Sequence, residues 1–243
     1  MPALFSPRPA ARTRRENAEN DANVRGALPH ETEVYMPKGS EELTNARKEE
    51  IIDACAQLYA ALPFKDITLG AIGAKTSFTR TSIYNYFRTK EEIFLALLQR
   101  EYAAWCKDLD SLAECVPLSA EDFASRFSNI LAGRGCMLKL MSMNLYDIED
   151  GSRLENLVEF KRVYHRSLNA VCRCLAAHFP ASTDEDRRGF VYAFFPFLFG
   201  VYPYTNSTEK QTEAMKIAGV AAPGYDISTL TRALTLTLTR PFR

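Results

Sequence analysis

Apolar residues recur every three to four positions in almost every segment of the chain after residue 50. The first such stripe passes through Ile51, Cys55, Leu58 and Leu62, which is the period of a helix with one buried face. Further stripes occupy residues 119–132, 136–147, 153–178, 185–202 and 226–240. No hairpin signal and no alternation of strands with helices accompanies them. The pattern therefore predicts an all-α fold.

One segment is ambiguous. Leu and Thr alternate from Leu234 to Thr239, as in a half-buried strand, but Ile227, Leu230 and Leu234 also lie on one helical face. We favour a helix here, because a lone strand would have no partner.

Charge and cysteine content limit the possible functions. The 243 residues include 30 Lys and Arg and 30 Asp and Glu, so only a local patch could attract nucleic acid. The six cysteines lack the paired spacings of a zinc site and are ordinary for a reduced protein. The longest charge-free apolar run, residues 190–204, is shorter than the roughly 20 residues of a membrane span. Without a secretory signal, the sequence predicts a cytoplasmic protein with no membrane contact, metal or cofactor.

Residues 1–43 are predicted to form a disordered tail, since prolines and charges alternate there without apolar periodicity. Arg8, Arg12, Arg14 and Arg15 could contact phosphates, but acidic residues follow directly, which favours a solvated arm. Met36 is an alternative start of the chain.

Three threonines stand where helix caps are expected. Thr68 precedes a short apolar segment, Thr79 precedes residues 80–87, and Thr89 precedes a long stripe with acids in its first turn. Pro63 ends the first helix. The order is therefore one helix, two short helices and a long fourth helix.

A local basic patch coincides with the two short helices. Residues 75–90 contain four Lys and Arg and no acid. Two short helices joined by a few residues have the spacing of a helix-turn-helix, whose second helix enters the major groove. Arg80, Thr81 and Asn85 are candidates for base readout, and Tyr84 and Tyr86 for phosphate contact. A solvated polar face with locally packed tyrosines is the alternative.

Residues from Ile51 to Leu98 resemble the amino-terminal DNA-binding domain of the TetR/AcrR family of transcriptional regulators. The landmarks occur in order, from Ala54, Leu58 and Tyr59, through Thr68 and Ile72, to Tyr84, Tyr86, Phe87, Lys90 and Glu91. Three positions depart from the family's pattern: Pro63 after the first helix, Lys75 near the end of the second, and Ser77 in the turn. Ser77 could change the turn angle.

The resemblance implies a homodimer bound to a near-palindromic operator in double-stranded DNA. It divides the chain into a tail (1–43), a helix-turn-helix domain (44–100) and a helical effector-binding and dimerisation domain (101–243). It places Thr44 and Arg47 on the DNA backbone and Lys90 on a phosphate. The full set of candidate DNA-contacting residues is Thr44, Arg47, Thr68, Thr79, Arg80, Thr81, Ser82, Tyr84, Asn85, Tyr86 and Lys90.

The carboxyl-terminal part contains an apolar run with eight aromatics, residues 190–204, which one chain could bury only in its core or against a partner. Paired with residues 227–238, this segment resembles the two carboxyl-terminal helices that form a four-helix dimer contact in the TetR family, and we favour that role over burial in the core. The candidate interface residues are Phe195, Leu198, Phe199, Tyr202, Leu230 and Leu234.

A small hydrophobic effector could bind among methionines and aromatics, because methionine adapts to varied shapes. The candidate effector-binding residues are Met137, Met141, Tyr146, Phe160, Tyr164 and His165. Ordinary core packing is the alternative. Neither His165 nor His178 lies near a nucleophile or at metal-ligand spacing, so the sequence nominates no catalytic residue.

Together these features predict a regulator, in the first instance a repressor, that a small-molecule effector releases from its operator. The alternative is a helical small-molecule-binding or scaffold protein with an incidental basic patch. An enzyme would need converging acid, base or metal groups, and no spacing suggests them.

Overall fold

The computed structural model describes residues 38–143, 145–221 and 224–242. The expectations for the arginines of the tail and for Met36 fall on residues 1–37, outside this described part. All regular structure in the described part is helical, which confirms the all-α fold. Its elements are α1 (Lys38–Ala61), η1 (Phe64–Asp66), α2 (Leu69–Gly73), η2 (Arg80–Asn85), α3 (Lys90–Ala113), α4 (Ala120–Ala132), α5 (Gly135–Met141), α6 (Leu145–Asp150), α7 (Leu154–His178), α8 (Asp184–Thr205), α9 (Glu209–Ile217), α10 (Ile227–Thr239) and η3 (Arg240–Phe242), where η denotes a 3₁₀ helix.

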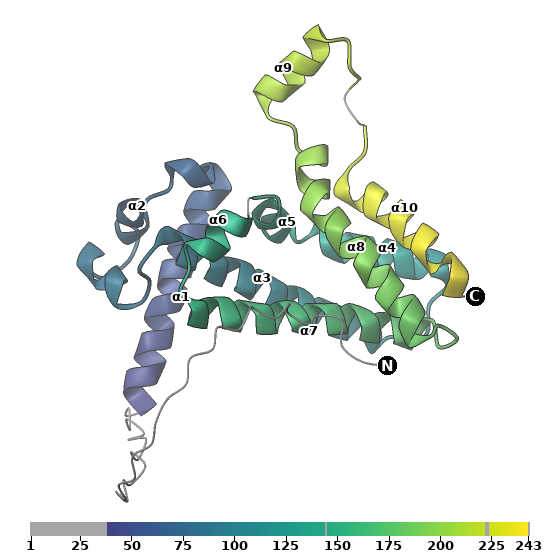
Figure 1. The fold of residues 1–243 in the computed structure, drawn as a ribbon, viewed down its shortest axis with the longest axis horizontal. Helices are drawn as coiled ribbons and strands as arrows, with labels where there is room; N and C mark the ends of the chain where they lie inside the picture. The colour runs from purple at the N-terminus through teal and green to yellow at the C-terminus, as the bar shows by residue number, and fades with distance from the viewer. Residues whose placement is uncertain (1–37, 144, 222–223, 243) are drawn as a thin grey trace, which may run out of the picture. The chain divides into compact units, whose positions relative to one another are not determined.

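Helix α3 lies at the centre of residues 38–242. It packs along α7 over much of its length and also touches α1, α4, α5 and α6 (Figure 1). Helix α8 packs on α5, α7 and α10, and α10 packs closely on α4. The helix-turn-helix region and the carboxyl-terminal helices therefore share α3 as their support.

The core between these helices is rich in aromatic rings. On α3, Tyr102 and Trp105 are fully buried, and the Trp105 ring lies 5.9 Å from that of Phe195 on α8. Tyr102 also contacts Phe160 and Tyr164 of α7 at 6.1 and 6.0 Å. Burying one such ring contributes on the order of 2–3 kcal/mol, so these contacts hold α3, α7 and α8 together.

Helix α10 packs on α4, and its fully buried side chains are threonines rather than leucines. Thr231, Thr235 and Thr239 are at most 1% exposed and recur every four residues. They face a helix whose buried face includes the small residues Ala124 and Ser128, and small side chains allow two helices to approach closely. The ambiguous Leu–Thr segment is therefore helical, and its strand-like alternation is misleading.

Several predicted boundaries were wrong. Helix α1 begins at Lys38, so residues 38–43 are helical rather than part of the tail. The stripe at 136–147 is divided between α5 and α6. Helix α8 extends to Thr205 through Pro196 and Pro203, because both prolines lie on its exposed side, where the unpaired carbonyls can bind water.

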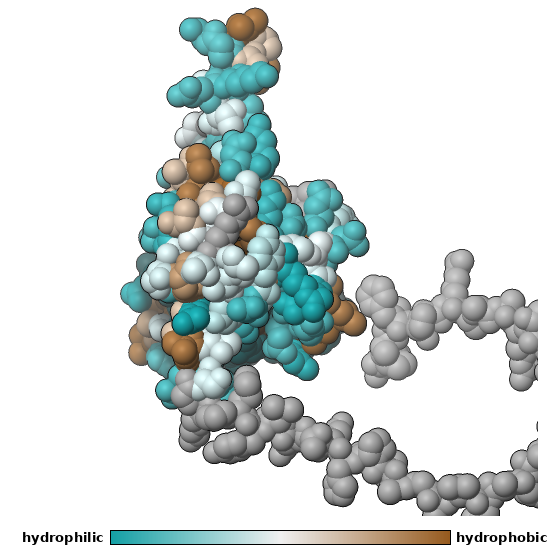
Figure 2. Space-filling model, turned by 90° about the vertical axis from the view of Figure 1, so that its left-hand side faces the viewer, coloured by the Kyte–Doolittle hydropathy of each residue, from teal (hydrophilic) through white to brown (hydrophobic). Residues whose placement is uncertain are grey.

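Helix α9 was not predicted. It stands above the other helices, between α8 and α10 (Figure 1), and projects at the top of the view in Figure 2. It buries no residue, and Ile217 at its end is 79% exposed. Within the described part, no helix combines the length and the apolar character needed to cross a membrane.

Candidate nucleic-acid interface

Buried apolar side chains fix the two short helices of the helix-turn-helix. Ile72 of α2 and Ile83 of η2 are 0% exposed, while Ile67 and Phe87 anchor the chain on either side of them. The second helix is shorter than predicted, because η2 is a 3₁₀ helix that ends at Asn85 rather than an α-helix that reaches Phe87. Since one face is anchored in the core, the opposite face is held rigidly outward.

That outward face is polar and free of acids. Thr81, Tyr84 and Asn85 are exposed, Tyr84 by 53%. Arg80 opens η2, but its side chain falls outside what the structure describes. The side of the molecule that carries α2 is largely hydrophilic, with scattered hydrophobic residues (Figure 2). Hydroxyl and amide groups in this arrangement can exchange hydrogen bonds with base edges and phosphates.

The other predicted residues of this segment are partly engaged within the chain. The Thr79 hydroxyl lies 2.8 Å from the Ser82 hydroxyl and caps no backbone amide, so Thr79 holds the cap position without its usual hydrogen bond. The half-buried Tyr86 ring packs 6.1 Å from that of Phe78. Thr68 caps α2 as predicted by accepting from the N–H of Ala71 (3.1 Å).

Helix α1 supports the turn between α2 and η2. The Glu50 carboxylate accepts hydrogen bonds from the Ser77 N–H and, at 3.0 Å, from the Ser77 hydroxyl. The Arg47 guanidinium lies 5.4 Å from the centre of the Phe78 ring, and the Thr44 hydroxyl donates to the carbonyl of Ser40 (2.7 Å). Glu50 was not among the predicted residues, because its partner Ser77 lies 27 residues away in the sequence.

Lys90 is less available to DNA than predicted. Its ammonium donates to the carbonyls of Phe64 (3.1 Å) and Ile67 (3.2 Å) and lies over the Phe64 ring. Only one of its three N–H groups is left for a phosphate. A shallow hollow of about 380 Å³ beside it is lined in part by Thr68 and Thr89, which cap α2 and α3.

A buried ion pair joins this domain to α7. Glu92 is 1% exposed, and its carboxylate accepts from the N–H of Arg88 (2.8 Å) and from Nε of Arg153 (2.6 Å). Burial raises the pKa of Glu92, but the hydrogen bonds from Arg153 and from the Arg88 backbone outweigh it and hold the pKa below its usual value. Arg153 also donates to the carbonyl of Tyr86 (3.4 Å), directly after η2. The end of η2 is thus tied to the start of α7.

The corner between α6 and α7 also touches α3. The Thr89 hydroxyl donates to the carbonyl of Gly151 (2.9 Å). A Cβ on Gly151 would lie 2.9 Å from Cγ of Glu91, closer than real side chains approach. Gly151 therefore does more than end α6, since it permits this close contact.

The predicted effector-binding residues are only partly brought together. The rings of Phe160 and Tyr164, both on α7, stack on each other with their centroids 6.4 Å apart, and Met137 and Met141 are fully buried. Tyr146 is 85% exposed, and the exposed His165 bonds to Asn169 on its own helix. Tyr146 and His165 therefore do not line a common interior pocket with the other four.

The predicted dimer residues also divide into two groups. Phe195 and Leu198 are 3% and 0% exposed in a single chain, so they belong to its own core and their assignment to an interface was wrong. Half-buried positions remain, namely Phe199, Tyr202, Leu230 and Leu234. Beside them, Tyr192 of α8 is 77% exposed.

No metal site accompanies these features in the described residues, where no three His, Cys, Asp or Glu side chains gather closely enough. The six cysteines are free. Burial raises the pKa of Cys55 and of Cys174 to about 12, so these two thiols are protonated at neutral pH.

Comparison with known proteins accounts for both halves of the chain. The family model described as "Bacterial regulatory proteins, tetR family" matches residues 51–97, and "Tetracyclin repressor-like, C-terminal domain" matches residues 99–240. The second match alone spans more than half of the chain. The chain belongs to the TetR family. As a TetR-family protein it is a DNA-binding transcriptional regulator rather than an enzyme.

Solved structures show the same fold. The fatty acid degradation regulator FadR from Bacillus halodurans is 18% identical with a TM-score of 0.53, over 79% of this chain and 94% of that chain. FadR from Bacillus subtilis, solved in complex with stearoyl-CoA, is 18% identical with a TM-score of 0.52, over 79% and 97%. No curated protein matched the chain.

The three departures from the TetR-family pattern have structural consequences. Pro63 ends α1 and leads into η1. Lys75 is exposed just after α2, where its charge adds to the acid-free face. Ser77 in the turn is held by Glu50, so a side chain there replaces a glycine without loss of the motif.

Proposed function

We propose that this TetR-family regulator binds a near-palindromic operator as a homodimer, and that a small-molecule effector releases it. The observation that carries the proposal is the acid-free face of η2, on which Thr81, Tyr84 and Asn85 are exposed while Ile83 is buried in the core. In a dimer, two such faces one DNA turn apart, about 34 Å, would reach successive major grooves.

An exposed apolar stripe on α8 supports the dimer. Tyr192, Pro196 and Gly200 are exposed and recur every four residues, with Phe199 half-buried beside them. Residues four apart lie on one side of a helix. A second copy of the chain would cover this stripe, and α10, which carries half-buried leucines, packs on α8.

The contacts that connect the end of η2 to the start of α7 support the proposal that an effector releases the protein from DNA. The Glu92–Arg153 pair and the Thr89–Gly151 hydrogen bond couple the position of η2 to the carboxyl-terminal helices. A ligand that favours another arrangement of these helices would lower operator affinity. Because Bacillus subtilis FadR was solved with stearoyl-CoA, long-chain acyl-CoA thioesters are the first effectors to test.

Operator selection followed by mobility-shift titration tests the DNA-binding proposal. The full chain should select a near-palindrome from random or genomic DNA, and its affinity should fall steeply between 50 and 200 mM salt. Tyr84→Ala should weaken operator binding at least about tenfold. The matched control is Tyr225→Ala, since Tyr225 is similarly exposed at 59% but lies before α10. Equal losses in both variants, or no selected palindrome, would favour a scaffold or carrier with an incidental basic patch.

A further inference from the structure

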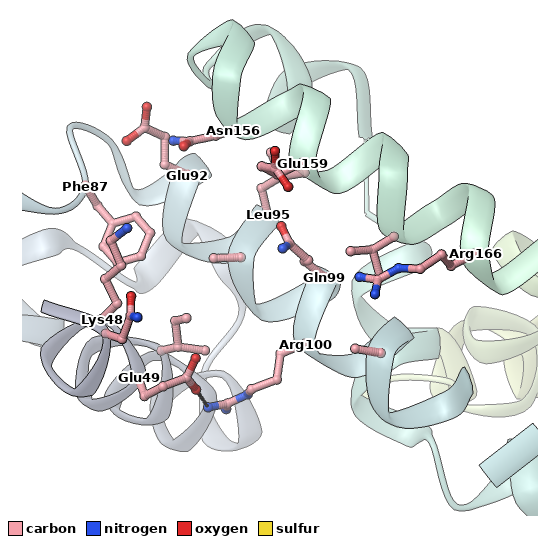
Figure 3. A pocket seen from close by; sticks show the side chains of 15 residues that line it. Lys48, Glu49, Phe87, Glu92, Leu95, Gln99, Arg100, Asn156, Glu159 and Arg166 are labelled. Carbon is pink, nitrogen blue, oxygen red and sulfur yellow. Dashed lines mark hydrogen bonds and ion pairs between the residues drawn. The ribbon is translucent and has the colours of Figure 1, made fainter. Parts of the chain in front are cut away.

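A groove of about 410 Å³ lies where α1, α3 and α7 meet, outside the core. Its floor is apolar and buried, formed by Ile52, Phe87, Leu95 and Val163. Lys48 rises beside Phe87 on one side, Arg166 comes from α7 on the other, and Leu95 lies between them (Figure 3). An apolar floor between polar walls is the usual construction of a small-molecule site, and this volume is within the usual range.

Each carboxylate that lines the groove is paired with an arginine. Glu49 pairs with Arg100 (3.1 Å), which also pairs with Asp53 (2.7 Å). Glu92 pairs with Arg153, and Glu159 pairs with Arg162. Each of these wall carboxylates therefore has a cationic partner within the protein, although Arg100 is shared between Glu49 and Asp53.

Two cations of the groove are not balanced in this way. Among the described residues, neither the Lys48 ammonium nor the Arg166 guanidinium makes a hydrogen bond or ion pair with another side chain or with a backbone group. The side-chain amides of Asn45, Gln99 and Asn156 in the same walls have no hydrogen-bond partner in the described part either. The groove therefore offers positive charge and amide groups above an apolar floor.

We propose that this groove binds a small amphipathic organic anion. The apolar body of the ligand packs on Phe87, Leu95 and Val163. Its anionic group, a carboxylate, sulfonate or phosphate, is held by the Arg166 guanidinium, because a planar guanidinium binds such groups through two N–H donors. The Lys48 ammonium on the other side of the groove adds positive charge that favours an anionic ligand.

A ligand here would reach the DNA-binding face through short connections, a consequence that rests on the proposed function. Lys48 directly follows Arg47 and lies two residues before Glu50, both of which contact the turn between α2 and η2. Phe87 in the floor lies two residues after the end of η2 at Asn85. The ligand would thus join α7 to the elements that position the DNA-contacting side chains, and preference for one arrangement would change operator affinity.

Fluorescence titration with 8-anilinonaphthalene-1-sulfonate tests the site, since this probe combines two aromatic ring systems with one sulfonate. With the full chain and no DNA, Arg166→Ala and Lys48→Ala should each weaken probe binding about three- to tenfold, and the double variant further. Arg188→Ala on α8 and Lys216→Ala on α9 are matched controls, because both residues are exposed and far along the chain from the groove. The controls should leave the affinity unchanged.

N-phenyl-1-naphthylamine, a neutral relative of the probe without the sulfonate, distinguishes recognition of the anionic group from nonspecific hydrophobic binding. Its affinity should be nearly the same in the wild type and in Arg166→Ala, but Ala96→Phe, which fills the groove, should weaken both probes. Sulfonate affinity that is unchanged in Arg166→Ala, Lys48→Ala and their double variant overturns the proposal. Since no DNA is present, a failure of operator binding in the mobility-shift experiment leaves this result standing.

Discussion

Glu92 is a fully buried carboxylate that stays ionised, which is costly unless its oxygens are satisfied. Four donors satisfy them: the backbone N–H groups of Arg88 and Arg153 and two nitrogens of the Arg153 guanidinium. No sequence rule pairs residues 61 positions apart, so this contact was absent from the sequence prediction, although both residues stand beside predicted helix ends. The same distance in sequence makes the pair a connection between domains.

Glu92→Gln should lower the free energy of unfolding by about 2–4 kcal/mol at pH 7, because it removes the charge that balances Arg153 in a buried setting. The folded pKa of Glu92 lies below its unfolded value of 4.5. The stabilisation is therefore complete above about pH 4.5 and is lost as the pH falls through the folded pKa. Urea unfolding at pH 7 and below pH 4.5 measures this difference. Glu159→Gln, in an exposed pair with Arg162, should change stability by less than about 1 kcal/mol.

Gly151→Ala should destabilise the fold by about 1–3 kcal/mol, since the new Cβ would meet Glu91 at 2.9 Å and the Asp147 carbonyl at 3.1 Å. Gly189→Ala is the matched control, because no atom lies within 4 Å of a Cβ there and α8 continues through it. The control should gain up to about 1 kcal/mol from helix propensity. Thermal unfolding of both variants decides between a close contact and an ordinary helix end.

At the scale of elements, local signals were the most reliable. The caps at Thr68 and Thr89 were predicted from neighbouring residues, and both accept the expected backbone hydrogen bond. The apolar stripes located most helices, because one face of each is buried. Helix α9 has no buried face, so periodicity could not reveal it, although Thr208 and Gln211 form a capping box at its start. The 3₁₀ form of η2 depends on how the chain is held at both ends, which periodicity does not report.

Helix α10 offers a prediction at this scale. The hydroxyl of Thr235 is buried with no hydrogen-bond partner among the described residues, whereas that of Thr239 donates to the Thr235 carbonyl (2.9 Å). Thr235→Val keeps the shape and removes an unsatisfied polar group, so it should raise the free energy of unfolding by about 1 kcal/mol. Thr239→Val loses a hydrogen bond and should give no such gain. A destabilised Thr235→Val in urea unfolding would mean that its hydroxyl has a partner after all.

At the scale of the molecule, the sequence predicts that residues 190–204 are buried. It does not specify whether they are buried in the core of the same chain or against a partner. The structure divides the segment between two sides of α8. Phe195 packs on Trp105 and Tyr164 within the chain, while Tyr192 and Pro196 are exposed. A charged substitution at Phe195 would therefore unfold the chain. Such a variant could not be used to test whether the protein forms a dimer. Which apolar face meets the core of the same chain depends on helix packing, and a single sequence does not specify it.

Tyr192→Glu tests the proposed homodimer without disturbing the core, since the side chain is 77% exposed. If two copies meet through this side of α8, a buried unpaired carboxylate would oppose their association by several kcal/mol, and light scattering should find monomers. Operator affinity should then fall by orders of magnitude, because each monomer contacts only one half-site. Tyr225→Glu introduces the same charge at a 59% exposed tyrosine outside the stripe and should remain dimeric. A Tyr192→Glu dimer with unchanged operator affinity would place the interface elsewhere.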